Sequence, residues 1–170
     1  MNKTLLLLRH AETEQLAHKD LERPLTEQGR HEAELVGRYL GENDLTPDTI
    51  VYSSARRARE TVERMLPHFA AAPSLKESSQ LYNAGPEEIT GQLQTMPDEL
   101  DTVALVGHSP GIPSLAIFLA ADDSDIGLID RVTASYPPAA VSVLRFDVAH
   151  WHEVAPALGR LESFISPDDL

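Results

Sequence analysis

The sequence predicts an α/β fold: a three-layer α/β/α sandwich with a mostly parallel central sheet. Three continuous apolar runs, at residues 5–8, 50–52 and 103–106, are typical of strands that are buried on both faces of a sheet. Between these runs and after the last one, apolar residues recur at the spacing of a helix that packs one face on a sheet. Strands that alternate with such helices form a parallel sheet that is covered on both sides.

Apolar spacing and helix-end residues place four helices. Two stripes follow the helical spacing: Ala33, Val36, Gly37 and Leu40, and then Ile112, Leu115, Ala116 and Leu119. Another helix is expected to begin after Ser54 and to carry apolar residues as far as Phe69. A further one begins at Pro86, because proline suits the first turn of a helix and the two acids that follow suit its positive end.

Late in the chain the pattern changes. Apolar and polar residues alternate over 144–148, which predicts a half-exposed strand that extends towards Trp151 and Val154. The short stretches around 73–74 and 122–125 are expected to be loops.

Composition and charge bound the function. A chain of 170 residues, 42% of them hydrophobic, is long enough to form a single domain over 1–170. Fourteen basic and 27 acidic residues give a net charge of −13, which would repel nucleic acids and anionic membranes, so neither is an expected partner. Without cysteine there is no disulfide or thiolate nucleophile. The run 5–8 is too short for a signal peptide or a membrane span, so a cytoplasmic location is expected.

Three segments that carry candidate chemical groups follow the three apolar runs. Arg9 and His10 come after the first run, and three arginines within 56–59 come after the second. His108 comes after the third run, in the glycine-flanked segment 106–111, and the helix behind it is expected to offer free N–H groups to an anion. Ligands bind beyond the carboxyl ends of the strands in open α/β sheets, so the segments are expected to share one rim. Guanidinium groups match phosphate oxygens, which favours a phosphoryl site in this acidic chain.

Each segment also has a simpler interpretation. An Arg-His pair at a strand end is often an exposed boundary, and His108 could be a histidine of the core. The arginines could form a solvated helix face that pairs with Glu60 and Glu63. The shared position at one edge of the expected sheet favours a common site.

Three motifs resemble those of a known family, and they occur in the same order: Arg9-His10-Ala11-Glu12-Thr13, Arg57-Ala58-x-x-Thr61 and Gly107-His108-Ser109-Pro110-Gly111. The family is the histidine phosphatase superfamily, which includes the phosphoglycerate mutases. Within it, the segment 20–26 and the later Tyr136, Pro137 and Trp151 look most similar to bacterial phosphohistidine phosphatases of SixA type.

The resemblance implies a phosphoglycerate mutase-like fold, with His10 as nucleophile and with Arg9, Arg57 and His108 as the rest of a phosphate pocket. It further implies that Ser109 and Thr13 help to bind the substrate, and that neither a metal nor another cofactor is used. The substrate is expected to be a protein that carries phosphohistidine, and a small phosphorylated metabolite is the alternative.

The chain departs from the family pattern at several positions, and one of these departures leaves the proton donor unidentified. Ala11 stands where many members have glycine, Ser109 where asparagine is common, and Leu16 where the mutase-like branch has asparagine. No carboxylate occurs from Leu81 until Glu87, in the region where the mutase-like branch has its general acid. The proton donor therefore stays open among four carboxylates: Glu12, Asp20, Glu22 and Glu87.

Two other classes of function remain as distant alternatives. A metal-dependent hydrolase could use His150 and His152, expected on one strand face, or His18 and Asp20. A non-catalytic phosphoryl-binding module would need the arginines but not the histidines, so the presence of both His10 and His108 counts against it.

Overall fold

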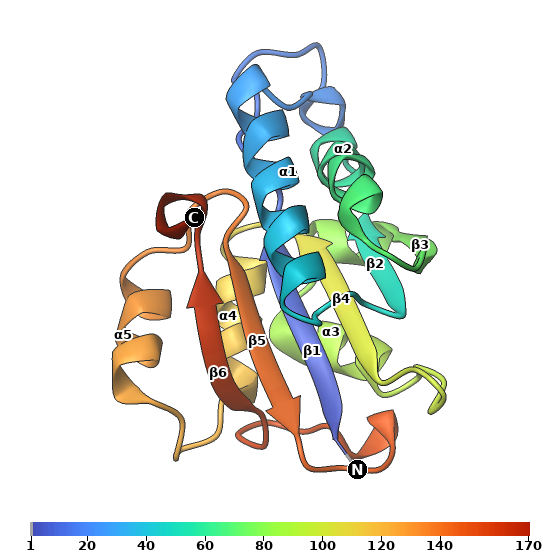
Figure 1. Ribbon diagram of the computed structural model, residues 1–170, viewed down its shortest axis with the longest axis vertical. Coiled ribbons are helices and arrows are strands. Elements are labelled where there is room, and N and C mark those ends of the chain that lie inside the picture. Colours follow the sequence, from blue (N-terminus) through green and yellow to red (C-terminus); the bar gives the residue numbers. More distant parts are fainter. Residues whose placement is uncertain (1) are drawn as a thin grey trace.

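The computed structural model describes residues 2–170. Its centre is a six-stranded sheet with the strand order β3-β2-β4-β1-β5-β6 (Figure 1). The strands are β1 (Lys3–Arg9), β2 (Thr49–Ser53), β3 (Ser74–Ser78), β4 (Thr102–Gly107), β5 (Val141–Phe146) and β6 (Arg160–Ile165). Strands β3, β2, β4 and β1 run parallel, β5 is antiparallel to β1, and β6 is antiparallel to β5. The expected mostly parallel sheet is confirmed.

Helices cover both faces of this sheet, as the three-layer prediction requires. They are α1 (Glu27–Glu42), α2 (Arg56–Met65), α3 (Pro86–Leu93), α4 (Gly111–Leu119) and α5 (Ile126–Ala134). Helices α1 and α2 pack on one face, and α3, α4 and α5 pack on the other. Within the described residues, no helix has the length and the apolar character that a membrane crossing requires.

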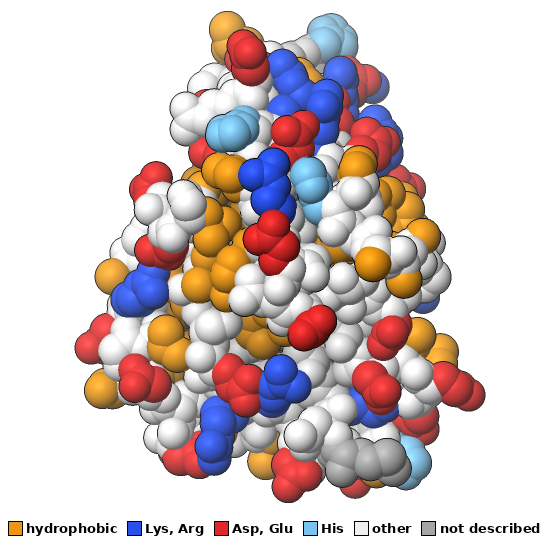
Figure 2. Space-filling model, viewed as in Figure 1, with side chains coloured by type: hydrophobic (Ala, Val, Ile, Leu, Met, Phe, Trp, Pro, Cys, Tyr) orange, Lys and Arg blue, Asp and Glu red, His pale blue; other side chains and the backbone are white. Residues whose placement is uncertain are grey.

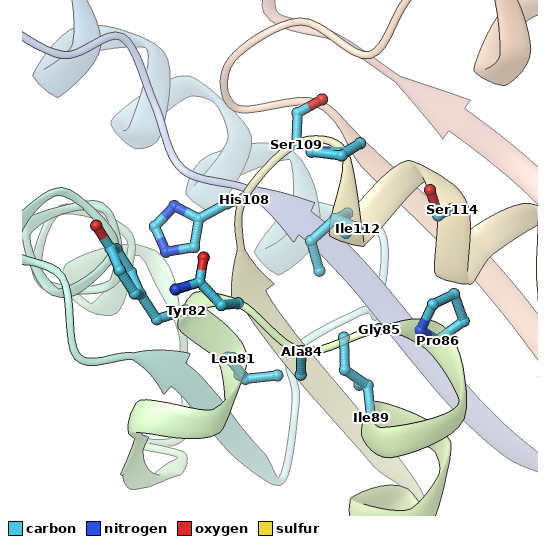
Figure 3. A pocket seen from close by; sticks show the side chains of 13 residues that line it. Leu81, Tyr82, Ala84, Gly85, Pro86, Ile89, His108, Ser109, Ile112 and Ser114 are labelled. Carbon is cyan, nitrogen blue, oxygen red and sulfur yellow. The ribbon is translucent and has the colours of Figure 1, made fainter.

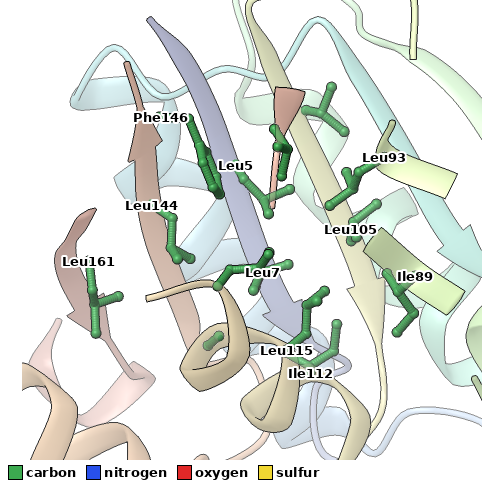
Figure 4. Packing of buried hydrophobic residues seen from close by; sticks show 14 of the residues in the cluster. Leu5, Leu7, Ile89, Leu93, Leu105, Ile112, Leu115, Leu144, Phe146 and Leu161 are labelled. Atoms are coloured by element: carbon green, nitrogen blue, oxygen red, sulfur yellow. The ribbon is translucent and has the colours of Figure 1, made fainter. Parts of the chain in front are cut away.

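Strand β1 lies inside the sheet and contributes to both cores. Leu5 and Leu7 point into the core beneath α3 and α4 (Figure 4), whereas Leu6 and Leu8 belong to the core beneath α1 and α2. None of the four is more than 1% exposed. Because successive side chains of a strand point to opposite faces, burial on both faces explains the continuous apolar run.

The helix ends follow the local sequence signals. The Thr26 side chain accepts a hydrogen bond from the Gly29 N–H and caps α1, and Pro86 is the first residue of α3. The helix expected to reach Phe69 is shorter: α2 ends at Met65 and continues as a single 3₁₀ turn that contains Pro67. Proline has no N–H to donate, so it interrupts the α-helical pattern of hydrogen bonds.

The expectation for the late strand is wrong in two respects. Strand β5 is buried at every residue except Arg145, since β1 and β6 flank it and both of its faces are covered. It also ends at Phe146, and Trp151 begins a separate 3₁₀ turn.

Strands β3 and β6 and helix α5 were not predicted from the sequence. Strand β3 includes Ser74, which the sequence analysis expected in a loop. The exposed edge strand β3 lacks any apolar pattern.

The strand order positions the candidate functional residues. Strands β2, β4 and β1 are consecutive neighbours and run in the same direction, so their carboxyl ends lie side by side. The segments that follow these ends are the three that carry the histidines and arginines.

Candidate active site

His10 lies immediately beyond β1, and the backbone around it is held from two sides. Its N–H donates to the carbonyl of Gly107 on β4, at 3.0 Å. The next N–H, of Ala11, donates to the Thr61 hydroxyl at 3.0 Å, and this hydroxyl in turn donates to the carbonyl of Arg57 at 2.7 Å. Thr61 is fully buried on α2. These bonds tie the segment after β1 to β4 and to α2.

The His10 ring is oriented by a hydrogen bond that leaves one nitrogen available. Nδ1 lies 2.7 Å from the Ala11 carbonyl, which can only accept, so Nδ1 carries the proton and Nε2 carries the lone pair. The ring is only 6% exposed, and burial lowers its pKa to about 3, with the charges of His108, Arg57 and Arg9 acting in the same direction. At neutral pH, His10 is thus a neutral imidazole with a free Nε2.

His108 faces His10 across the site, with 5.3 Å between the ring centroids. Its Nε2 lies 2.7 Å from the hydroxyl of Ser53, a fully buried residue at the end of β2. Within residues 2–170, His108 Nε2 is the one acceptor that lies within hydrogen-bond distance of the Ser53 hydroxyl. We therefore assign the hydroxyl as the donor to Nε2, which places the proton of the His108 ring on Nδ1. Burial, with help from the Arg57 charge, lowers the pKa of His108 to about 4.

The guanidinium groups of Arg57 and Arg9 approach the two rings from different elements. Arg57 stands in the first turn of α2 and donates to the carbonyl of Asp20 at 2.8 Å and to its carboxylate at 3.1 Å. Arg9, the last residue of β1, donates to the carbonyl of Tyr136 at 2.8 Å. The Tyr136 hydroxyl donates back to the Leu7 carbonyl at 2.6 Å, which anchors that segment to β1.

One feature of the hydrogen bonding sets these side chains apart. Among the described residues, three buried side-chain nitrogens have no partner, and they are Arg9 Nε, Arg57 Nε and His108 Nδ1. All three are N–H donors in the assigned states. Buried polar groups are nearly always paired, so three unpaired donors in one cluster indicate a site that binds an anion.

The remaining substrate-binding residues expected from the resemblance lie less centrally. The Thr13 hydroxyl donates to the carbonyl of Pro24 at 2.8 Å and so closes a loop of backbone. Ser109 is exposed at the turn before α4. The flanking Arg56 and Arg59 pair with Glu60 and Glu63, as the solvated-face interpretation expects.

The helix behind His108 differs from the expectation that it offers free N–H groups. The N–H groups of Ile112 and Ser114 donate to the carbonyls of His108 and Pro110. Pro113 has none to give. Most of the first turn of α4 is thus occupied by the chain itself.

Of the four candidate proton donors, Asp20 is the one in contact with the cluster. Its carboxylate accepts from the Tyr82 hydroxyl, from Arg23 at 3.1 Å and from Arg57 at 3.1 Å. The Tyr82 bond, with help from Arg23 and Arg57, lowers the pKa of Asp20 to about 2. Asp20 is therefore ionised at neutral pH and has no proton to donate.

The other three carboxylates have no bond to the cluster. Glu12 accepts from the Thr26 hydroxyl at 3.1 Å, and Glu22 and Glu87 are exposed.

The histidines proposed for a metal site do not share a strand face. His150 precedes a 3₁₀ turn, and its ring stacks on that of His152 with 5.2 Å between centroids. His150 Nδ1 lies 2.8 Å from a carboxylate oxygen of Asp98. Asp98 also accepts from Lys3 through its carbonyl, so this group lies at the opposite end of β1 from His10. Residues 2–170 contain no group of three or more potential ligands from His, Cys, Asp and Glu.

Four residues that the sequence analysis gave no role in the site hold it together. Ser53 and Tyr82 contact His108, and Thr61 and Tyr136 hold the backbone of the segments that carry the charged groups. Thr61 stands in the second motif and Ser53 is the first polar residue after a buried run, so both had a signal. Tyr82 had none, because its partners are remote in sequence.

The α/β fold and this cluster of two imidazoles and two guanidinium groups define a phosphatase of the class that uses a histidine nucleophile. The chain belongs to the histidine phosphatase superfamily (branch 1), whose family model matches residues 5–99.

Relatives extend the match to nearly the whole chain. An uncharacterised protein of Mycobacterium tuberculosis is 32% identical over 149 residues, which cover 87% of this chain and 91% of that protein. A structure from Nakamurella multipartitia, provisionally described as phosphohistidine phosphatase SixA, has a TM-score of 0.84 and 29% identity and covers 98% of this chain and 97% of its own. A similarly described SixA structure from Agrobacterium tumefaciens has a TM-score of 0.79 and 26% identity, with coverage of 97% and 99%.

The lowered pKa values predict how the site responds to acid. The imidazole of an unfolded chain takes up a proton near pH 6.5, whereas folded His10 does so only near pH 3. Between these values the unfolded state binds more protons, so His10 makes the folded state less stable as the pH falls from about 6.5 towards 3. Nitrogen-detected NMR is expected to show His10 neutral, with the proton on Nδ1, from pH 8 to pH 5. A midpoint near 6.5 for this ring would contradict the assignment.

Proposed function

We propose that this protein is a phosphohistidine phosphatase in which His10 is the nucleophile and Arg9, Arg57 and His108 bind the transferred phosphoryl group. The observation that carries the proposal is the set of three unpaired buried donors, because each belongs to one of these side chains. A phosphoryl group has three oxygens, and it is a ligand that could accept from all three donors at once. A single sheet built from residues 3 to 165 supports one catalytic domain over the chain.

In the first step, the lone pair of His10 Nε2 attacks phosphorus and a P–N bond forms. The bond from phosphorus to the leaving group breaks, and its electron pair goes to that group. The positive charges of Arg9 and Arg57 and the Nδ1–H of His108 stabilise the phosphoryl oxygens during transfer. The bond from Nδ1 to the Ala11 carbonyl stabilises the ring as it becomes cationic, because the acceptor faces the N–H of the imidazolium.

In the second step, water attacks the phosphorus of phosphorylated His10. The P–N bond breaks, its electron pair returns to Nε2, and both protons of the water leave with the phosphate. The site thereby returns to its neutral starting state.

The state of the carboxylates favours a phosphohistidine substrate. An alkoxide leaving group needs a proton, and the one carboxylate in contact with the cluster, Asp20, is ionised. A phosphorylated imidazole that is protonated on its other nitrogen leaves as a neutral ring and needs none. The SixA descriptions of the Nakamurella multipartitia and Agrobacterium tumefaciens structures support the same substrate class.

The phosphoryl site is expected to work without a metal. Exhaustive treatment with EDTA should leave the rate on p-nitrophenyl phosphate unchanged, because arginine side chains supply the positive charge. Vanadate or tungstate should inhibit competitively, since either oxyanion fits the same donors. The measurement is steady-state kinetics after dialysis, with and without added Zn²⁺ or Mg²⁺. Loss of activity on chelation that Zn²⁺ restores would favour the metal-dependent alternative.

A further inference from the structure

A cavity of about 360 Å³ adjoins His108 on the side away from α1 (Figure 3). Its walls are two segments that are remote in sequence. One runs from Leu81 to Ile89, through the turn before α3, and the other runs from His108 to Ser114, through the turn into α4. His108 belongs both to this cavity and to the phosphoryl cluster of His10, His108, Arg9 and Arg57. Tyr82 also lines the cavity, and its ring packs against His108 and Arg57. A group attached to the phosphorus could therefore extend directly into it.

The lining of this cavity carries no formal charge. Apolar side chains of Leu81, Ile89 and Ile112 line it, and Asn83 and Ser114 add polar but uncharged groups. None of its lining residues is Asp, Glu, Lys or Arg. His108 is neutral here as well, because its pKa is lowered to about 4.

The helix at the edge of the cavity offers little to an anion. Helix α4 begins there, but the N–H groups of Ile112 and Ser114 are bonded to carbonyls and Pro113 has no N–H. The positive end of this helix is thus largely satisfied within the chain. A second anionic group on the substrate would lose part of its hydration and would meet no cationic side chain in this cavity.

Charged side chains border the site on its other side. A separate hollow beside the loop that follows β1 is lined by His18, Glu22, Arg56 and Arg59. In Figure 2, side chains of Lys, Arg and His, with Asp and Glu among them, gather at the top of the view, near this loop and α2. The two sides of the phosphoryl cluster therefore differ in kind, one charged and one neutral.

We propose that the neutral cavity receives the leaving group, and that it selects an uncharged, ring-sized leaving group over one that carries a second anionic charge. This inference rests on the proposed phosphatase function and specifies its substrate class. A phosphorylated imidazole of a histidine fits this description, as does an uncharged aryl phosphate. Small metabolites with a second phosphate or a carboxylate do not.

Ser114 allows this proposal to be tested at one position. Its exposed side chain lines the cavity from α4, and none of the hydrogen bonds described involves its hydroxyl. The substrates are 3-carbamoylphenyl phosphate and 3-carboxyphenyl phosphate, which have nearly the same shape and differ in one charge. The measured quantity is the ratio of kcat/KM for the amide to that for the carboxylate. Ser114→Lys is expected to lower this ratio about fivefold and Ser114→Asp to raise it about fivefold, because the added charge faces the leaving group.

The matched control is Ser79→Lys, which adds the same charge at an exposed position outside the cavity. Its ratio should stay within about twofold of the wild-type value. Melting temperatures verify that each variant is folded, and either Ser114 variant alone is sufficient for the comparison. If both substrates are hydrolysed with a ratio that neither Ser114 variant moves, the cavity assignment is wrong and the phosphatase function stands. If the wild-type protein hydrolyses neither substrate and acquires no phosphate on His10, both proposals fail.

Discussion

Replacement of His10 by alanine is expected to abolish turnover of p-nitrophenyl phosphate, with a loss of about 10⁴-fold or more. The variant has no nitrogen to form the P–N bond, while the arginines that bind the phosphoryl group remain. The fold should persist, because the His10 ring bonds only to the carbonyl of the next residue and lies at the end of a strand. The substitution also removes a buried imidazole that makes the folded state less stable in acid. Phosphate release, far-ultraviolet circular dichroism and the melting temperature measure these effects.

The control for this variant is His31→Ala, which removes an exposed histidine on α1 and should leave the rate unchanged. Acid-labile phosphate attached to the wild-type protein, and absent from the His10 variant, would identify the intermediate directly. A His10→Ala enzyme that keeps more than about one per cent of the wild-type rate would remove His10 from the nucleophile role.

The second large effect concerns the leaving group. Phosphohistidine in a peptide should be hydrolysed at least about 10²-fold faster than phosphoserine in a comparable peptide, since the serine alkoxide has no acid to protonate it. For the same reason, rates on a series of aryl phosphates should rise steeply as the pKa of the leaving phenol falls. Initial rates of phosphate release at constant ionic strength give both results.

Four conservative variants separate this explanation from a hidden proton donor: Glu12→Gln, Asp20→Asn, Glu22→Gln and Glu87→Gln. Each should change the rate on phosphohistidine by well under 10²-fold, the lower range for a lost general acid. Asp20→Asn keeps the backbone carbonyl that holds Arg57, and it removes the negative charge together with one of the two oxygens that accept from Arg23, Arg57 and Tyr82. Two results together would instead indicate a general phosphomonoesterase: one of these variants loses ester hydrolysis, and the wild-type enzyme hydrolyses sugar phosphates efficiently.

The sequence was most informative where burial is uniform. The three apolar runs became the middle parts of β1, β2 and β4, because a strand that is covered on both faces is apolar along most of its length. The same logic placed the cores of α1 and α4. It failed for β3, whose exposed residues carry no pattern, and for β5, where Arg145 reaches the surface through an otherwise buried strand.

The order of the candidate residues along the chain, and their position after strands, followed from the sequence itself. His10, Arg57 and His108 were each found beside an apolar run, and chain direction places the ends of parallel strands at one edge. What the sequence could not determine is which atoms remain available for a ligand. That depends on contacts between residues far apart in the chain.

Only the tertiary structure decided those contacts. One nitrogen of His108 is hydrogen-bonded to Ser53. Two nitrogens of Arg57 donate to Asp20, and one nitrogen of Arg9 donates to the carbonyl of Tyr136. Burial, which is a property of the packed molecule, moves the pKa of His10 from the usual imidazole range to about 3. Local sequence therefore determined which chemical groups reach the edge of the sheet, because strand and helix patterns are short-range. Long-range packing determined their protonation, their orientation and the uncharged cavity beside them, because desolvation and hydrogen bonding depend on every neighbour in space.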